Sequence, residues 1–184
     1  MSNYIFDINK MDQMHNHITE NNTKVLMSFE NRVIRGRVRK EFEQMYPNFA
    51  QITATKIDKK QLAVTIHEID ESNDRQKYEF IIGDDYPFKP PVIMFQNRPY
   101  REFLQISHSP QDLELFKRVS GLNCLCCTSI TCSGRWSPGY MMRHVIDEVN
   151  KIRKYRRNMI YKIITDKIKT RYLVADIDLE SWLF

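Results

Sequence analysis

The chain has 184 residues, 42% of them hydrophobic, and a net charge of +5, which is the composition of one soluble domain with a sizeable core. A charge this modest does not demand a nucleic-acid partner, and no apolar run approaches the ~18 residues of a membrane-spanning helix. The N-terminus lacks the basic start and apolar run of a signal peptide, so we expect a reducing compartment, cytoplasmic or nuclear (the host cytoplasm if the protein is virus-encoded).

The first 28 residues are polar, and we interpret them as an N-terminal extension of a single domain at residues 29–184. From Ser28, which suits an N-cap, apolar residues recur at steps of three to five and predict an amphipathic helix. These apolar residues are Phe29, Val33, Ile34, Val38, Phe42 and Met45. The other face carries Arg32, Arg35, Arg37, Arg39 and Lys40. Such a face is either solvated surface or a docking face for an acidic partner.

Four strand-like runs follow, and the polar turns between them predict a four-stranded antiparallel meander. The runs are Ala50–Ile57, Gln61–Ile69, Lys77–Ile82 and Pro91–Phe95. Between the last two lies Tyr86–Pro91 (Tyr-Pro-Phe-Lys-Pro-Pro), whose three prolines cannot donate to a central strand. That segment is predicted to be a stiff, extended connection, with or without a partner surface. In the irregular stretch after it, only Gln111–Val119 indicates a short helix.

After Trp136, Ser137 and Pro138 suit the cap and first turn of another helix. Apolar residues at helical spacing then continue from Met141 to Ile168, interrupted by a basic run at Arg153–Arg157. We interpret the basic run as a solvated face and expect no nucleic-acid partner. The predicted fold is therefore α+β: an N-terminal helix, a four-stranded antiparallel meander, a cysteine loop and C-terminal helices.

All four cysteines lie in one loop, and two kinds of chemistry compete for them. They are Cys124, Cys126, Cys127 and Cys132. Structural zinc sites use two separated Cys-x2-4-Cys knuckles, whereas four ligands from nine contiguous residues would need a tight wrap, so we expect no metal. The alternative is a nucleophilic thiol, which needs no histidine partner when it exchanges with an already activated thioester. No signature ties His67, His108 or His144 to a cysteine, and no cofactor is expected.

Two motifs in combination resemble the ubiquitin-conjugating enzyme family. Tyr86–Pro91 precedes a strand, and Gly121–Leu125 (Gly-Leu-Asn-Cys-Leu) leads to Trp136–Pro138 (Trp-Ser-Pro) in the family's order. The resemblance covers about residues 29–153 and implies the family's fold. It implies that Cys124 accepts ubiquitin or a ubiquitin-like protein as a thioester and passes it to a lysine amine or a ligase. The contact residues that it implies are Arg32, Arg35 and Arg39 for the ubiquitin-activating enzyme, and Pro87, Phe88, Ser137 and Pro138 for a ubiquitin ligase.

The chain departs from the family where a His-Pro-Asn motif is expected after the fourth strand. In the family, that Asn supports the active-site loop and stabilises the oxyanion when lysine attacks. Here Arg98–Tyr100 is followed by Arg101–Phe103 (Arg-Glu-Phe), which supplies no Asn. Substitute donors in the right part of the chain are Asn123, which adjoins Cys124 and is the first choice, Asn97 and His108.

Three interpretations of the sequence stay open. The first is an active conjugating enzyme, and the retained Cys124 favours it. The second is a catalytically weak or inactive variant that serves as a binding module in the ubiquitin pathway, and the missing Asn favours it. The third, a zinc-stabilised interaction domain, depends on the cysteine cluster alone.

Overall fold

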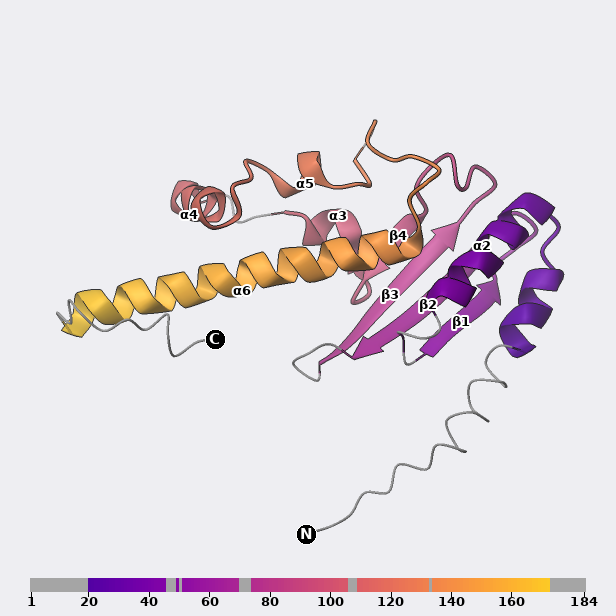
Figure 1. The fold of residues 1–184 in the computed structure, drawn as a ribbon, viewed down its shortest axis with the longest axis horizontal. Helices are drawn as coiled ribbons and strands as arrows, with labels where there is room; N and C mark the ends of the chain where they lie inside the picture. The colour runs from indigo at the N-terminus through magenta and orange to yellow at the C-terminus, as the bar shows by residue number, and fades with distance from the viewer. Residues whose placement is uncertain are drawn as a thin grey trace, which may run out of the picture.

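An antiparallel sheet and a long helix form the two main layers of the computed structural model (Figure 1). The structure describes residues 20–45, 49, 51–69, 74–105, 109–132 and 134–172. The strands lie in chain order across the sheet: β1 (Gln51–Lys56), β2 (Leu62–Ile69), β3 (Arg75–Ile82), β4 (Val92–Phe95) and β5 (Arg98–Pro99). The helices are residues 20–27, α2 (Arg32–Met45), α3 (Tyr100–Phe103), α4 (Pro110–Ser120), α5 (Leu125–Thr128) and α6 (Met142–Tyr172).

The antiparallel meander is confirmed, but the sheet has five strands where the sequence predicts four. The chain reverses directly after β4 through Gln96 and Asn97, which have left-handed φ values of 51° and 61°. This tight turn lays Arg98 and Pro99 against the end of β4. A two-residue strand shows no period in a sequence, and Pro99 is tolerated there because β5 is the edge of the sheet.

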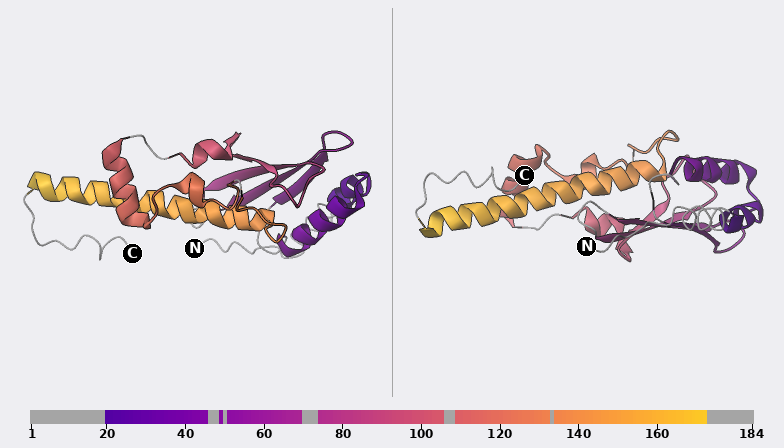
Figure 2. Two further views of the ribbon diagram at one scale, coloured as in Figure 1. Left: turned by 90° about the horizontal axis from the view of Figure 1, so that it is seen from above. Right: turned by 60° about the horizontal axis from the view of Figure 1, so that its bottom comes forward.

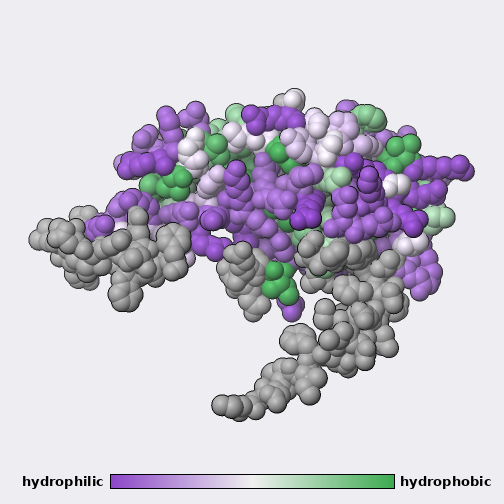
Figure 3. Space-filling view, viewed as in Figure 1, coloured by the Kyte–Doolittle hydropathy of each residue, from purple (hydrophilic) through white to green (hydrophobic). Residues whose placement is uncertain are grey.

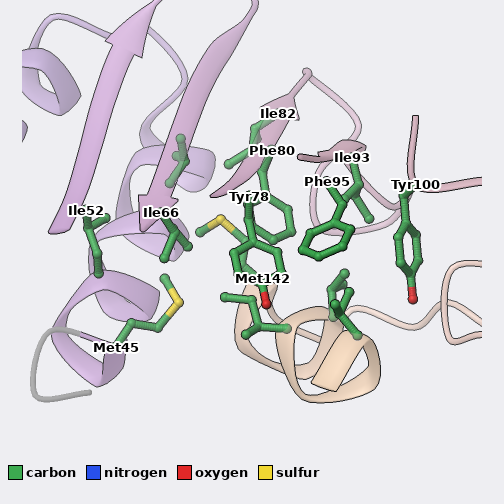
Figure 4. Close-up of a cluster of buried hydrophobic side chains, with 14 of the residues drawn as sticks. Met45, Ile52, Ile66, Tyr78, Phe80, Ile82, Ile93, Phe95, Tyr100 and Met142 are labelled. Carbon is green, nitrogen blue, oxygen red and sulfur yellow. The ribbon is translucent and has the colours of Figure 1, made fainter. Parts of the chain in front are cut away.

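The core lies between one face of the sheet and the helices α2 and α6, which cover that face together (Figure 2). Alternate side chains of β3 point into it, with Tyr78, Phe80 and Ile82 fully buried. Met45 of α2 and Met142 of α6 meet them from the helical layer (Figure 4). The period-2 burial of the strands and the apolar stripes of the helices therefore build one continuous core.

Helix α2 begins at Arg32, not at the predicted Ser28 cap. The carboxamide oxygen of Asn31 accepts hydrogen bonds from the backbone N–H groups of Val33 and Ile34, at 3.1 and 3.2 Å. Asn31 is thus the N-cap, while the Ser28 hydroxyl closes the preceding short helix instead. This shift of the start turns Val33, predicted to be in the apolar stripe, out to solvent.

The rest of the predicted stripe of α2 is confirmed, and the short helix before it also joins the core. Ile34, Val38, Phe42 and Met45 are buried. Phe29 is fully buried but lies between the two helices rather than in one. In the short helix, Asn22 donates to the Ile52 carbonyl and accepts from the Ala54 N–H, each at 2.7 Å. Its amide satisfies backbone groups of β1, an edge strand.

Helix α6 runs without a break through the basic run that the sequence analysis placed between two helical patterns. Arg156 in that run donates to the carbonyls of Phe103 and Gln105, so part of the run fixes the chain after the sheet. The far end of α6 extends well beyond the sheet (Figure 1). On the face shown in Figure 3, the described residues are mostly hydrophilic, and hydrophobic side chains form separate small patches. None of the described helices has the length and apolar character needed to cross a membrane.

Candidate active site

The Cys124 thiol lies where the chain leaves α4 and turns into α5. Gly121 ends α4 in a left-handed conformation at φ 69°, which glycine adopts without strain. Cys124 itself is extended, at φ −158°, and is the N-cap residue of the short helix α5. Leu125, the next residue, is buried in the core, while Cys124 stays partly exposed. The buried Leu125 therefore holds the backbone next to Cys124 in place, while the Cys124 sulfur stays accessible.

Two further cysteines surround this thiol. The Cys124 and Cys126 sulfurs are 2.7 Å apart, and the Cys126 and Cys127 sulfurs are 3.8 Å apart. All three sulfurs lie within 4.8 Å of one another. Cys126 and Cys127 are exposed and free. Cys132 is not part of this group, so the structure brings together three of the four cysteines and not the fourth.

The shared hydrogen between Cys124 and Cys126 makes the two thiols chemically different. The Cys126 side chain, followed by the Cys127 backbone N–H, lowers the pKa of Cys124 from its usual range. The same contact with Cys124 raises the pKa of Cys126 to about 11. Cys124 is therefore the more acidic thiol of the pair, and the thiolate is the nucleophilic form of cysteine.

The loop after Cys124 is held to the fold by Glu148 of α6. One carboxylate oxygen accepts from the Tyr100 hydroxyl at 2.7 Å and from the Ser129 hydroxyl at 2.9 Å. The other accepts from the Ile130 backbone N–H at 3.0 Å. Burial, followed by the charge of Glu148, raises the pKa of Tyr100, so its hydroxyl remains a donor. Glu148 was not among the predicted site residues, because no local pattern in the sequence separates it from its exposed neighbour Asp147.

The two motifs of the sequence analysis meet in space. The Trp136 indole N–H donates to the Pro87 carbonyl at 2.7 Å, and the Trp136 and Tyr86 rings pack with centroids 6.3 Å apart. Of the predicted ligase contacts in the two segments, Phe88, Ser137 and Pro138 are exposed and Pro87 is half-buried. Phe88 is 73% exposed, so its ring does not pack in the core.

A buried carboxylate, Glu41 of α2, holds Tyr86 and the start of α6 in place. It accepts from the Arg37 guanidinium at 2.6 Å, from the Met142 backbone N–H at 2.8 Å and from the Tyr86 hydroxyl. Arg37 also donates to the Tyr140 carbonyl at 2.6 Å. Arg37, one of the arginines on the predicted docking face, is therefore an internal structural residue.

No family model, curated protein or solved structure matches this chain. What the site does must therefore be inferred from its own geometry and from the motifs that compose it.

The other arginines of the first predicted helix remain available to a partner. Arg32 and Arg39 are exposed, and Arg39 pairs with Glu43 at 3.1 Å. Arg35 donates to the Met27 carbonyl at 3.3 Å. All three arginines line a hollow of about 270 Å³ between α2 and the short helix before it. The predicted basic face is thus a concave surface rather than a flat one.

The substitute oxyanion donors differ in how far they are available. The side chain of Asn97 lies in the turn between β4 and β5, where it accepts from Lys77 at 2.9 Å. Asn123 adjoins Cys124 and is exposed. His108 lies outside the described residues. Asn123 therefore stays the first choice among the predicted donors, on the basis of its exposure and its place next to Cys124 in the chain.

Proposed function

We propose that the protein is a ubiquitin-conjugating enzyme, in which Cys124 accepts ubiquitin or a ubiquitin-like protein as a thioester. The observation that carries the proposal is the partly exposed Cys124 thiol, which has a lowered pKa and lies on a loop that Glu148 holds to the fold. The modifier would leave Cys124 for a lysine amine or for the thiol of a ligase. The ubiquitin-activating enzyme and a ubiquitin ligase are the partners that this activity requires.

Thioester exchange at Cys124 requires little more than an available thiolate. The Cys124 thiolate attacks the thioester carbonyl that the activating enzyme presents, a new carbon–sulfur bond forms, and the old one breaks as the activating enzyme's thiolate leaves. Cys126 favours the thiolate by lowering the pKa of Cys124. No general base is needed for this step, because the thiolate itself attacks an already activated thioester.

The contact between Trp136 and Pro87 supports the same proposal. It joins the two segments that would present a continuous surface to a ligase, with Phe88 and Pro138 on the outside. Aromatic side chains exposed on a rigid turn are frequent contact residues of protein interfaces. The hollow lined by Arg32, Arg35 and Arg39 would receive acidic groups of the activating enzyme.

The test is a charging assay with activating enzyme, ATP and ubiquitin. We expect a reductant-sensitive adduct that Cys124→Ala abolishes, whereas the matched control Cys132→Ala leaves it. Cys124→Ser is expected to form a slower, reductant-resistant oxyester, because a hydroxyl is the poorer nucleophile and its ester the more stable product. The assignment is wrong if Cys124→Ala still charges and Cys126→Ala or Cys127→Ala does not.

A weakly active or inactive variant that acts as a binding module is the second candidate, and one observation favours it. The three residues at the expected His-Pro-Asn position, Arg101–Phe103, lie in α3 and offer no carboxamide. Loss of one oxyanion donor typically slows a reaction about 10²–10³-fold. A module of this kind would bind ubiquitin-pathway proteins without transferring ubiquitin.

Discharge of the preformed thioester to free lysine separates the two candidates. We predict near-normal charging and slow discharge, because charging exchanges one thioester for another whereas lysine attack builds a tetrahedral oxyanion. Single-turnover discharge of the wild type is compared with Asn123→Ala. A further drop in Asn123→Ala identifies Asn123 as the substitute donor, while equally fast discharge in both proteins contradicts the prediction. Failure to charge at all assigns the protein to the binding-module class.

A further inference from the structure

Cys124, Cys126 and Cys127, here called the thiol trio, form a group of metal-ligand side chains on one exposed turn. We propose that the thiol trio reversibly binds a thiophilic metal ion, for which Zn²⁺ is the probe, and that the bound ion blocks Cys124. Metal binding is inferred from the geometry of the three sulfurs alone. That the bound ion would regulate the protein by blocking Cys124 rests on the proposed function. Thiolate ligands select ions such as Zn²⁺ and Cu⁺ over harder cations.

One of the three sulfur pairs already has the separation that a tetrahedral ion requires. Zinc–sulfur bonds of about 2.3 Å at tetrahedral angles place two ligand sulfurs about 3.8 Å apart. The Cys126 and Cys127 sulfurs already have that separation, at 3.8 Å. The Cys124 and Cys126 sulfurs, at 2.7 Å, must move apart, and their exposure leaves room for the side chains to rotate. The trio therefore needs side-chain adjustment and no change of fold.

The trio differs from the four-thiolate site that the cysteine spacing argues against. Its three ligands come from one turn of four residues, so a bound ion joins no separate elements of the fold. Cys132 stays outside the group, which leaves the fourth position of the ion to water or another external ligand. Closed sites with four protein ligands are structural, whereas sites with an open position exchange their external ligand. The ion would accordingly regulate the turn and not stabilise the domain.

Binding is coupled to loss of the thiol protons. Each cysteine that coordinates the ion releases its proton to solvent, so affinity rises with pH. Once coordinated, the Cys124 sulfur donates electron density to the metal and is a weaker nucleophile toward a thioester.

The first experiment is a titration of the reduced full-length protein with Co²⁺, followed by competition with Zn²⁺, in a phosphine reductant that does not chelate. We expect a thiolate-to-cobalt charge-transfer band that saturates at one equivalent and disappears when Zn²⁺ is added. Cys126→Ser and Cys127→Ser should each weaken binding by at least the roughly 10–100-fold that loss of an outer-shell partner costs. The control Cys132→Ser should bind as the wild type does. An absent band, or an unchanged affinity in the Cys126→Ser/Cys127→Ser double variant, overturns the inference.

The second experiment tests the block without the activating enzyme. Alkylation of Cys124 by iodoacetamide, read by mass spectrometry, should be suppressed by Zn²⁺ and restored by a chelator, in the wild type and in Cys132→Ser. For each variant, the alkylation of Cys124 with zinc is compared with its alkylation without zinc. In the Cys126→Ser/Cys127→Ser double variant, zinc should no longer protect Cys124. A melting temperature that falls sharply on chelation would identify a structural ion and contradict the proposal.

The two proposals fail separately. A protein that shows the cobalt band but never charges with ubiquitin refutes the proposed function and keeps the metal site. One that charges on Cys124 but binds neither Co²⁺ nor Zn²⁺ refutes the metal site and keeps the function.

Discussion

At the scale of single residues, the candidate site contains two thiols of different acidity. Cys124 and Cys126 are two residues apart, and their sulfurs are in contact. The contact moves their pKa values in opposite directions, so Cys124 is the more acidic thiol and Cys126 the less acidic one. Opposed shifts in a pair of titratable groups indicate division of roles in a site.

The pair predicts a pH profile. A lowered pKa means that Cys124 is thiolate at lower pH than an ordinary thiol, so iodoacetamide should label Cys124 at a lower pH than Cys126. Cys126→Ala removes the donor and should shift the Cys124 profile to higher pH, whereas Cys126→Ser keeps a hydroxyl donor and should shift it less. Mass spectrometry of the alkylated peptides measures the profile. Coincident profiles for Cys124 and Cys126 in the wild type would refute the assignment of donor and acceptor.

At the scale of elements, the cysteine loop owes its position to α6. Glu148 binds the loop at Ser129 and Ile130, and it binds Tyr100 at the start of α3. A carboxylate accepts several hydrogen bonds at once, so one side chain fixes two segments that are otherwise far apart in the chain. This support comes from a different residue than the Asn that the family resemblance leads one to expect.

Replacing Glu148 by glutamine tests that support. A carboxamide offers one acceptor oxygen where the carboxylate offers two, so the loop should loosen and the protein should lose about 1–3 kcal/mol of unfolding free energy. Denaturant unfolding measures the loss, and limited proteolysis within residues 124–132 measures the loosening. The matched control, Glu114→Gln, changes an exposed carboxylate of α4 and should alter neither. Equal proteolysis of the two variants would show that Glu148 does not hold the loop.

The sequence predicted the elements better than their junctions. The stripe of α2 and the meander follow from local periodicity, which a single sequence displays. The predicted start of α2 was wrong, because Ser28 and Asn31 both suit an N-cap. Only the packing of Phe29 between two helices decides between them. The contacts of Glu148 with Ser129 and of Trp136 with Pro87 join residues 19 and 49 positions apart, a separation that no local pattern reveals.

At the scale of the whole molecule, two carboxylate–tyrosine pairs, each with a buried tyrosine, join the helical layer to the rest of the fold. Glu41 of α2 binds Tyr86 and the first turn of α6. Glu148 of α6 binds Tyr100 beside the sheet. Burial, followed by the neighbouring carboxylate charge, raises the pKa of both tyrosines, because a phenolate there would be desolvated and repelled.

These pairs predict alkaline sensitivity. A tyrosine whose pKa is higher in the folded state stabilises the fold fully below its unfolded pKa of about 10, and that stability is lost as the pH rises from there toward the folded-state pKa. The melting temperature should therefore fall steeply above about pH 10. Tyr86→Phe and Tyr100→Phe should each lower stability at neutral pH by about 1.5–3 kcal/mol and flatten the alkaline decline. Parallel curves for the wild type and both variants would contradict the prediction.

Helix α6 extends beyond the sheet, so the backbone of its two ends should open to different degrees. Its 31 residues extend about 46 Å at 1.5 Å per residue, whereas an eight-residue strand spans about 27 Å. Residues 142–152 carry the buried stripe, while Ile160, Ile164 and Ile168 are exposed. Amide hydrogens of the first region should exchange with deuterium only on global unfolding, and those near Ile164 by local opening. The helix would thus fray from its far end toward the sheet and stop fraying by Arg156, which donates to the carbonyls of Phe103 and Gln105.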